Sequence, residues 1–135
     1  MRRWHTYVLV FFCMMMLAAC SVQKADTKKI RDIEFTVVDR DDIPEELMTQ
    51  IKEGQSEPFK LTYADKEYLY IARGYGTKNT TGYSVKVQKC YETSNSIYIK
   101  TDILGPSKDE EILKKETFPY VVVKTEYSEK SVTFD

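Results

Sequence analysis

The most constraining feature of this 135-residue chain is the alternation of apolar and polar side chains in two neighbouring segments. Tyr83, Val85 and Val87 alternate with polar residues between positions 83 and 91, and residues 97–103 repeat the pattern with isoleucine as the main apolar residue. A period of two places successive side chains on opposite faces of a β-strand. The two segments therefore predict an antiparallel sheet with one buried face and one face in water.

One amphipathic helix is predicted ahead of these strands. Apolar residues recur at every fourth position from Ile43 to Ile51, and a glycine follows the last turn. Asp42 precedes Glu45 by three residues, the spacing of a helix cap, so the helix is predicted over residues 42–53.

The complete pattern predicts an α+β domain that is mostly β. We expect an antiparallel sheet of about five to six strands with the amphipathic helix packed on it, in a single domain. The chain has no alternation of strands and helices that would indicate a parallel sheet. The remaining predicted strands cover residues 33–37, 68–73, 120–127 and 131–134.

The N-terminus has the pattern of a bacterial lipoprotein signal. Arg2 and Arg3 precede an uncharged segment, residues 7–19, which as a helix would span about 20 Å and is too short for a hydrocarbon core of about 30 Å. It runs into Leu17-Ala18-Ala19-Cys20, which resembles the lipobox, where the cysteine is acylated before cleavage. We therefore predict a signal peptide over residues 1–19 and a lipid anchor on Cys20.

This N-terminus predicts where the rest of the chain lies. Residues 20–32 are predicted to be the lipidated cysteine and a flexible polar tether, and residues 33–135 the folded domain. The protein is then expected in the cell envelope, anchored on the extracytoplasmic side of a bacterial membrane.

The composition argues against most catalytic chemistry. The only histidine, His5, lies in the predicted signal, so histidine-based nucleophilic catalysis and histidine zinc sites lack their central group. Cys90 is the only cysteine after Cys20, and its neighbours fit a strand, which favours a structural role. Without Arg2 and Arg3 the chain is acidic, which argues against nucleic acid. We predict no catalytic residue, no metal and no cofactor.

The most distinctive connection is the polar, glycine-rich segment between residues 74 and 83. It lacks the spacing of a dinucleotide fingerprint or a P-loop. Its glycines and Asn79 suit turns with positive φ, whereas its threonines and tyrosines suit recognition of another protein. Both interpretations, a turn only and a binding loop, remain open. The candidate binding residues are Gly74, Gly76, Thr77, Asn79, Thr80, Thr81, Gly82, Tyr83, Pro119 and Tyr120.

The same region resembles the C-terminal domain of the PrcB family of protease complex subunits, over residues 68–134. The resemblance rests on Ile71-x-x-Gly74, on Thr77-x-Asn79-Thr80-Thr81-Gly82-Tyr83-x-Val85-x-Val87, on Pro106 and on Phe118-Pro119-Tyr120-Val121-Val122-Val123. The family's usual Thr-Gly-Gly-Tyr reads Thr80-Thr81-Gly82-Tyr83, with Thr81 in place of the first glycine. The resemblance implies a noncatalytic exported subunit that assembles with a surface protease and stabilises it.

Two other functions remain open. Thr80-Thr81-Gly82-Tyr83 is also similar to the end of a loop in chagasin-like cysteine protease inhibitors, although the partner Arg-Pro-Trp loop is missing. A hydrolase that uses a pair of carboxylates is the third option, but no spacing singles out two acidic residues.

Overall fold

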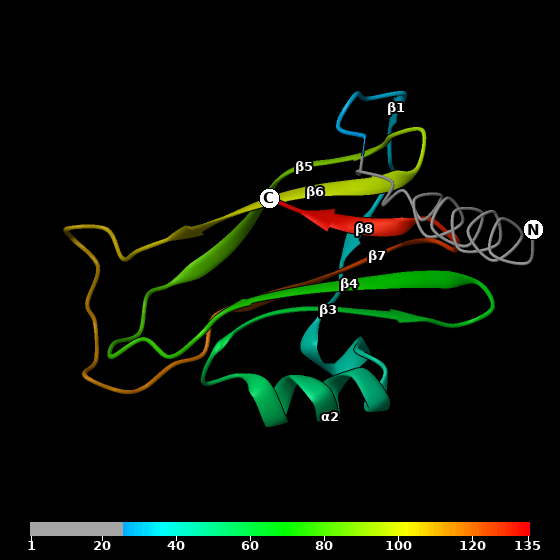
Figure 1. Cartoon of the computed structure of the whole chain (residues 1–135). Coiled ribbons are helices and arrows are strands. Elements are labelled where there is room, and N and C mark those ends of the chain that lie inside the picture. The colour runs from blue at the N-terminus through cyan, green and yellow to red at the C-terminus, as the bar shows by residue number, and fades with distance from the viewer. Residues whose placement is uncertain (1–25) are drawn as a thin grey trace, which may run out of the picture.

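The computed structural model describes residues 26–135, so the predicted signal peptide and Cys20 lie outside the described residues. Within this range the chain forms two four-stranded sheets and one α-helix (Figure 1). The mostly β fold class with one helix is thus confirmed, but the strands form two sheets instead of one. The elements are β1 (Arg31–Asp32), β2 (Thr36–Val37), η1 (Arg40–Asp42), α2 (Glu45–Gly54), β3 (Pro58–Ala64), β4 (Tyr68–Tyr75), β5 (Ser84–Glu92), β6 (Ser96–Leu104), β7 (Tyr120–Glu126) and β8 (Ser131–Phe134).

The strand order is β1-β5-β6-β8 in the first sheet and β2-β7-β4-β3 in the second. The pairings are antiparallel except that of β6 with β8, which is parallel. The N-terminal segment belongs to both sheets, because β1 pairs with β5 and β2 pairs with β7. Residues 31–37 therefore cross from one sheet to the other, and we call them the crossing segment.

The second sheet is covered on both faces, by the first sheet on one side and by α2 on the other (Figure 1). Ile71 and Val123 are fully buried against Ile99 of the first sheet. Their neighbours in sequence, Ala72 and Val122, face the opposite way and pack with the helix. This explains why β4 and β7 contain uninterrupted apolar runs.

The helix begins later than the sequence predicted. Residues 40–42 form a 3₁₀ turn, and α2 starts at Glu45 with Pro44 directly before it. The residue before a proline is disfavoured in the helical region, and Ile43 has an extended backbone with ψ 131°. The predicted cap at Asp42 is therefore wrong, whereas the predicted apolar face of the helix is buried at Leu47 and Ile51.

Two segments extend the fold beyond the prediction. Strand β3 was not predicted, although its alternate residues Phe59, Leu61 and Tyr63 pack toward the helix side of the second sheet. The described part of the predicted tether also contacts the first sheet, where the backbone N–H of Ile30 donates to the Glu92 carbonyl at 2.8 Å. The folded domain thus starts before residue 33.

Candidate functional site

Two loops lie side by side beyond one end of the sheets (Figure 1). Residues 76–83 join β4 to β5, and residues 105–119 join β6 to β7. We call the pair the loop arm. Lys78 and Thr117 exchange both backbone hydrogen bonds, at 2.8 and 2.9 Å, as paired strands do. The Thr117 hydroxyl also donates to the Thr80 carbonyl at 2.7 Å, so the two loops hold each other in place.

Thr81 makes the second link between the loops. Its backbone N–H donates to the Leu113 carbonyl at 3.1 Å, and its hydroxyl oxygen accepts from the Leu113 N–H at 3.0 Å. A glycine at this position could make only the first of these bonds. The departure from the Thr-Gly-Gly-Tyr pattern therefore adds a contact inside the loop arm.

Two different physical constraints require glycine in this segment: a positive φ at some positions and the close approach of another side chain at others. Gly76 and Gly82 have φ of +78° and +96°, as predicted for a turn, whereas Asn79 does not have a positive φ. Gly82 also lies against Pro106, where a Cβ would come within 2.7 Å of the proline Cβ. Gly74 instead lies in β4 beneath the ring of Phe59, and a Cβ there would be 2.1 Å from the ring. The prediction of positive φ is thus wrong for Gly74 and Asn79.

Several predicted binding residues serve the fold itself. Gly74 pairs with Phe59 on one side and with Tyr120 on the other, and the two aromatic rings lie 6.4 Å apart between centroids. The Pro119 carbonyl accepts from the Tyr75 N–H at 3.1 Å. Thr77 binds the Ser56 carbonyl through both its N–H and its hydroxyl. These residues attach the loop arm to the second sheet.

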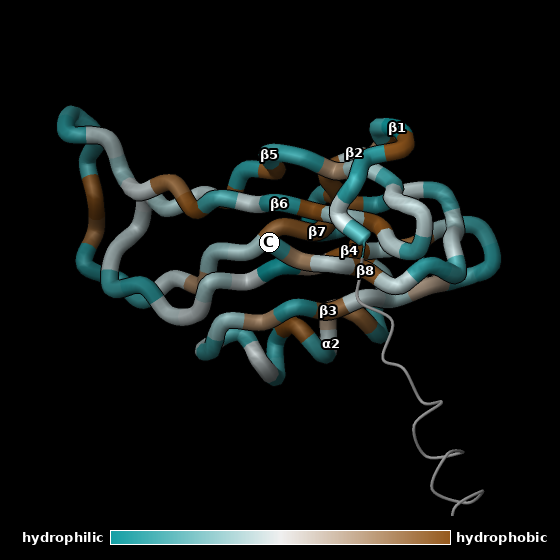
Figure 2. The backbone as a smooth tube through the Cα atoms, turned by 45° about the horizontal axis from the view of Figure 1, so that its top comes forward, coloured by the Kyte–Doolittle hydropathy of each residue, from teal (hydrophilic) through white to brown (hydrophobic). Residues whose placement is uncertain are grey.

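The accessible surface of the loop arm differs from the predicted one. Among the predicted residues only Asn79 is exposed, and Tyr83 is half-buried with the Lys78 ammonium 5.8 Å from its ring centroid. The exposed apolar side chains belong to the other loop, where Ile112 is 46% and Leu113 67% exposed. Figure 2 shows this hydrophobic stretch, residues 112–113, on the loop that projects beyond the end of the sheets. Its signal in the sequence is an apolar pair within a highly charged segment.

Cys90 lies in the core between the sheets and is 5% exposed. Burial raises the pKa of its thiol to about 11, so the thiol stays protonated at neutral pH. A buried, protonated thiol is a poor nucleophile, which confirms the structural interpretation of this residue.

The described fold shows neither a cluster of metal-ligating side chains nor a membrane-spanning helix. Among residues 26–135 no three cysteine, histidine or acidic side chains gather as metal ligands would. No helix in this range is long and apolar enough to cross a bilayer.

Two sheets, one helix and an apolar-tipped loop arm define a mostly β protein with a candidate protein-binding surface at one end. Residues 69–126 match the family described as PrcB C-terminal. The match runs from β4 to β7 and includes the whole loop arm, but not β8. No curated protein and no solved structure matches the chain.

Proposed function

We propose that this protein is a noncatalytic, lipid-anchored subunit that binds and stabilises another exported protein in a protease complex at the bacterial cell surface. The family match of residues 69–126 supports the assignment to this kind of subunit. The lipobox ending at Cys20 supports the anchor and the extracytoplasmic location. The absence of histidine after position 5 supports a role in binding instead of catalysis.

The observation that carries the proposal is the pair of exposed apolar residues on a loop that is already hydrogen-bonded in place. Leu113 is 67% exposed, yet its backbone N–H and carbonyl are both bonded to Thr81. Ordering a mobile loop on binding would cost conformational entropy, and a preformed loop avoids much of that cost. An exposed apolar side chain on such a loop is well suited to insert into a partner.

A pull-down from membranes solubilised in mild detergent tests the proposal. The full chain with Leu113→Asp should lose its partner, because the new charge would be desolvated at the contact. The control is Ile30→Asp, which makes the same change at a residue that is 61% exposed and lies outside the loop arm. Circular dichroism should show the same unfolding temperature for both variants. Equal recovery of every partner by the two variants would remove the loop arm from the proposal.

The anchor and the competing function have separate tests. Cys20→Ala should abolish acylation and leave the protein with its signal attached, which mass spectrometry of the intact protein measures. Titration of the protein against a papain-like cysteine protease distinguishes a subunit from an inhibitor. Stoichiometric loss of protease activity would favour the chagasin-like alternative over the proposed role.

A further inference from the structure

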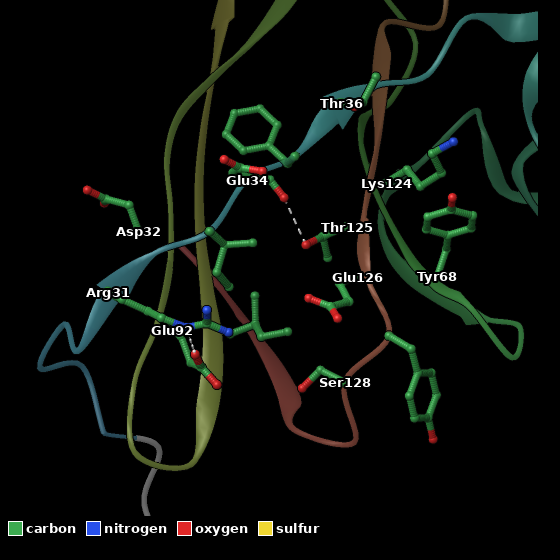
Figure 3. A pocket seen from close by; sticks show the side chains of 14 residues that line it. Arg31, Asp32, Glu34, Thr36, Tyr68, Glu92, Lys124, Thr125, Glu126 and Ser128 are labelled. Atoms are coloured by element: carbon green, nitrogen blue, oxygen red, sulfur yellow. Dashed lines mark hydrogen bonds and ion pairs between the residues drawn. The ribbon is translucent and has the colours of Figure 1, made fainter.

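A hollow of about 1030 Å³ lies where the crossing segment leaves the first sheet and joins the second (Figure 3). It is at the opposite end of β4 from the loop arm, because β4 begins at Tyr68, which lines the hollow, and ends at Tyr75 beside the arm. Eight strand residues separate the two by roughly 23 Å. The hollow is therefore a second surface, separate from the loop arm.

The lining of the hollow is acidic overall. Glu92 is already neutralised, since it forms ion pairs with Arg31 and with Lys130, the latter at 2.8 Å. Asp32 pairs with Lys29 at 2.9 Å. The charged groups of the lining are four carboxylates, of Asp32, Glu34, Glu92 and Glu126, and two cations, Arg31 and Lys124.

Two carboxylates of the lining have no cation bound to them. Among residues 26–135, neither Glu34 nor Glu126 makes an ion pair or a side-chain hydrogen bond. Glu126 attracts Arg31 only through space, and the contact of Glu34 with Thr125 uses its backbone carbonyl, at 3.0 Å. In Figure 3, Glu34 and Glu126 lie on either side of Thr125. Two negative charges thus face one hollow without a bound counter-charge from the described chain.

Apolar and aromatic groups complete the hollow. Ile97, which is 2% exposed, and Ile33 form an apolar part of its lining. Three large aromatic side chains are exposed around it: Phe35 and Tyr68 at 37% and Tyr127 at 45%. Aromatic faces attract cations, and the Lys124 ammonium already lies 4.5 Å from the ring centroid of Tyr68.

We propose that this hollow binds a lysine- or arginine-bearing segment of a partner protein. The aliphatic part of the basic side chain packs on Ile33 and Phe35, and its charged end lies between Glu34 and Glu126. The volume suffices for a side chain with its flanking backbone. A neutral saccharide would use the aromatic rings but leave both carboxylates unneutralised, and an acidic segment would be repelled. The charge of the lining therefore favours a basic partner.

Isothermal titration of the full chain in a nonionic detergent tests this inference with defined peptides. The probes are an acetylated, amidated glycine–serine peptide that contains two lysines, and the same peptide with norleucine or glutamate at those positions. We expect only the lysine peptide to bind, and to bind less tightly as salt is added. Glu34→Gln with Glu126→Gln should weaken its binding by about fivefold to tenfold, the effect of losing two partly exposed charge pairs.

The control variant is Glu53→Gln with Glu57→Gln, which changes the net charge by the same amount at exposed residues outside the hollow. It should bind the lysine peptide as tightly as the unchanged protein does. Absence of lysine-peptide binding, equal binding of the norleucine peptide, or full affinity in the Glu34 and Glu126 variant would each overturn the inference. Binding of chitotetraose in place of the lysine peptide would make the hollow a saccharide site and overturn it too. The inference goes beyond the proposed role of the loop arm, and the Leu113→Asp pull-down can fail or succeed independently of it.

Discussion

Replacement of Gly74 by alanine should destabilise the protein because of Phe59 and not because of backbone conformation. The φ of Gly74 is not positive, so alanine can adopt its backbone. The new Cβ would, however, lie 2.1 Å from Cε1 and 2.4 Å from Cδ1 of the Phe59 ring. Nonbonded carbon atoms prefer about 3.5–4.0 Å, so the ring must leave its place beside Tyr120 and the helix.

The expected magnitude follows from two opposing effects. Overfilling a packed site costs about 1–3 kcal/mol, whereas replacing a strand glycine by alanine otherwise gains about 0.5–1 kcal/mol. The net loss of unfolding free energy for Gly74→Ala is then about 1 kcal/mol, within a range of about 0–2.5 kcal/mol. In a Phe59→Ala background the ring is absent, and the same substitution should be neutral or stabilising. The coupling between the two sites is therefore about 2 kcal/mol.

Urea unfolding of the unchanged protein, both single variants and the double variant, followed by circular dichroism, measures this coupling. Gly54→Ala is the matched control, because its Cβ would meet no atom within 4 Å and the substitution should stabilise α2 by up to about 1 kcal/mol. An equal loss of stability from Gly74→Ala with and without the Phe59 ring would refute the packing explanation. The loss would then have to come from the backbone of β4 or from a neighbour other than the Phe59 ring.

Gly82→Ala should speed hydrogen exchange in the loop arm, because a residue with a side chain pays about 1–3 kcal/mol for a φ of +96°. Gly105→Ala is the control and should leave the exchange rates unchanged, because its added Cβ would lie 3.7 Å from the nearest atom, an ordinary contact. Burial raises the pKa of the Cys90 thiol from 9.0 to about 11. The free energy of unfolding should therefore fall by up to about 3 kcal/mol as pH rises from 9 to 11. The Cys90→Val variant should not show this contribution to the loss of stability. Hydrogen bonds from the Lys130 ammonium and the Arg31 guanidinium hold the pKa of the Glu92 carboxyl below its ordinary value of 4.5. The stability that this carboxylate contributes should be present above pH 4.5 and lost as pH falls through the lowered pKa, and acid unfolding of Glu92→Gln should lack that component.

Local patterns predicted those parts of the fold that depend on neighbouring residues. The β5–β6 hairpin was predictable because apolar and polar residues alternate along most of both strands and its partners are adjacent in the chain. The uninterrupted apolar runs 69–72 and 121–123 indicate strands that are buried on both faces, a signal for a second layer that a single-sheet interpretation overlooks. The parallel pairing of β6 with β8 joins segments that no local pattern relates, so the sequence could not show it.

The sequence predicted a loop within the loop arm, but not the contacts that hold the loop in place. Glycines and threonines mark residues 74–83 as a loop, yet the contact between Thr81 and Leu113 joins residues 32 positions apart. The hollow could not be predicted from the sequence, because most of its lining comes from residues 31–36 and 124–128, at opposite ends of the described chain. Only the fold brings Glu34 and Glu126 to the same place.

The crossing segment determines how the protein responds to mechanical force. Tension on the chain before Asp26 first meets the hydrogen bonds of Asp26 with the β5–β6 turn and then β1, which has only two residues paired with β5. It next reaches β2, which has two residues paired with β7. These short attachments should detach under load before the long pairing of β5 with β6. Because the same segment forms one wall of the hollow, a pull on the chain before Asp26 would dismantle that cavity first and leave the loop arm intact.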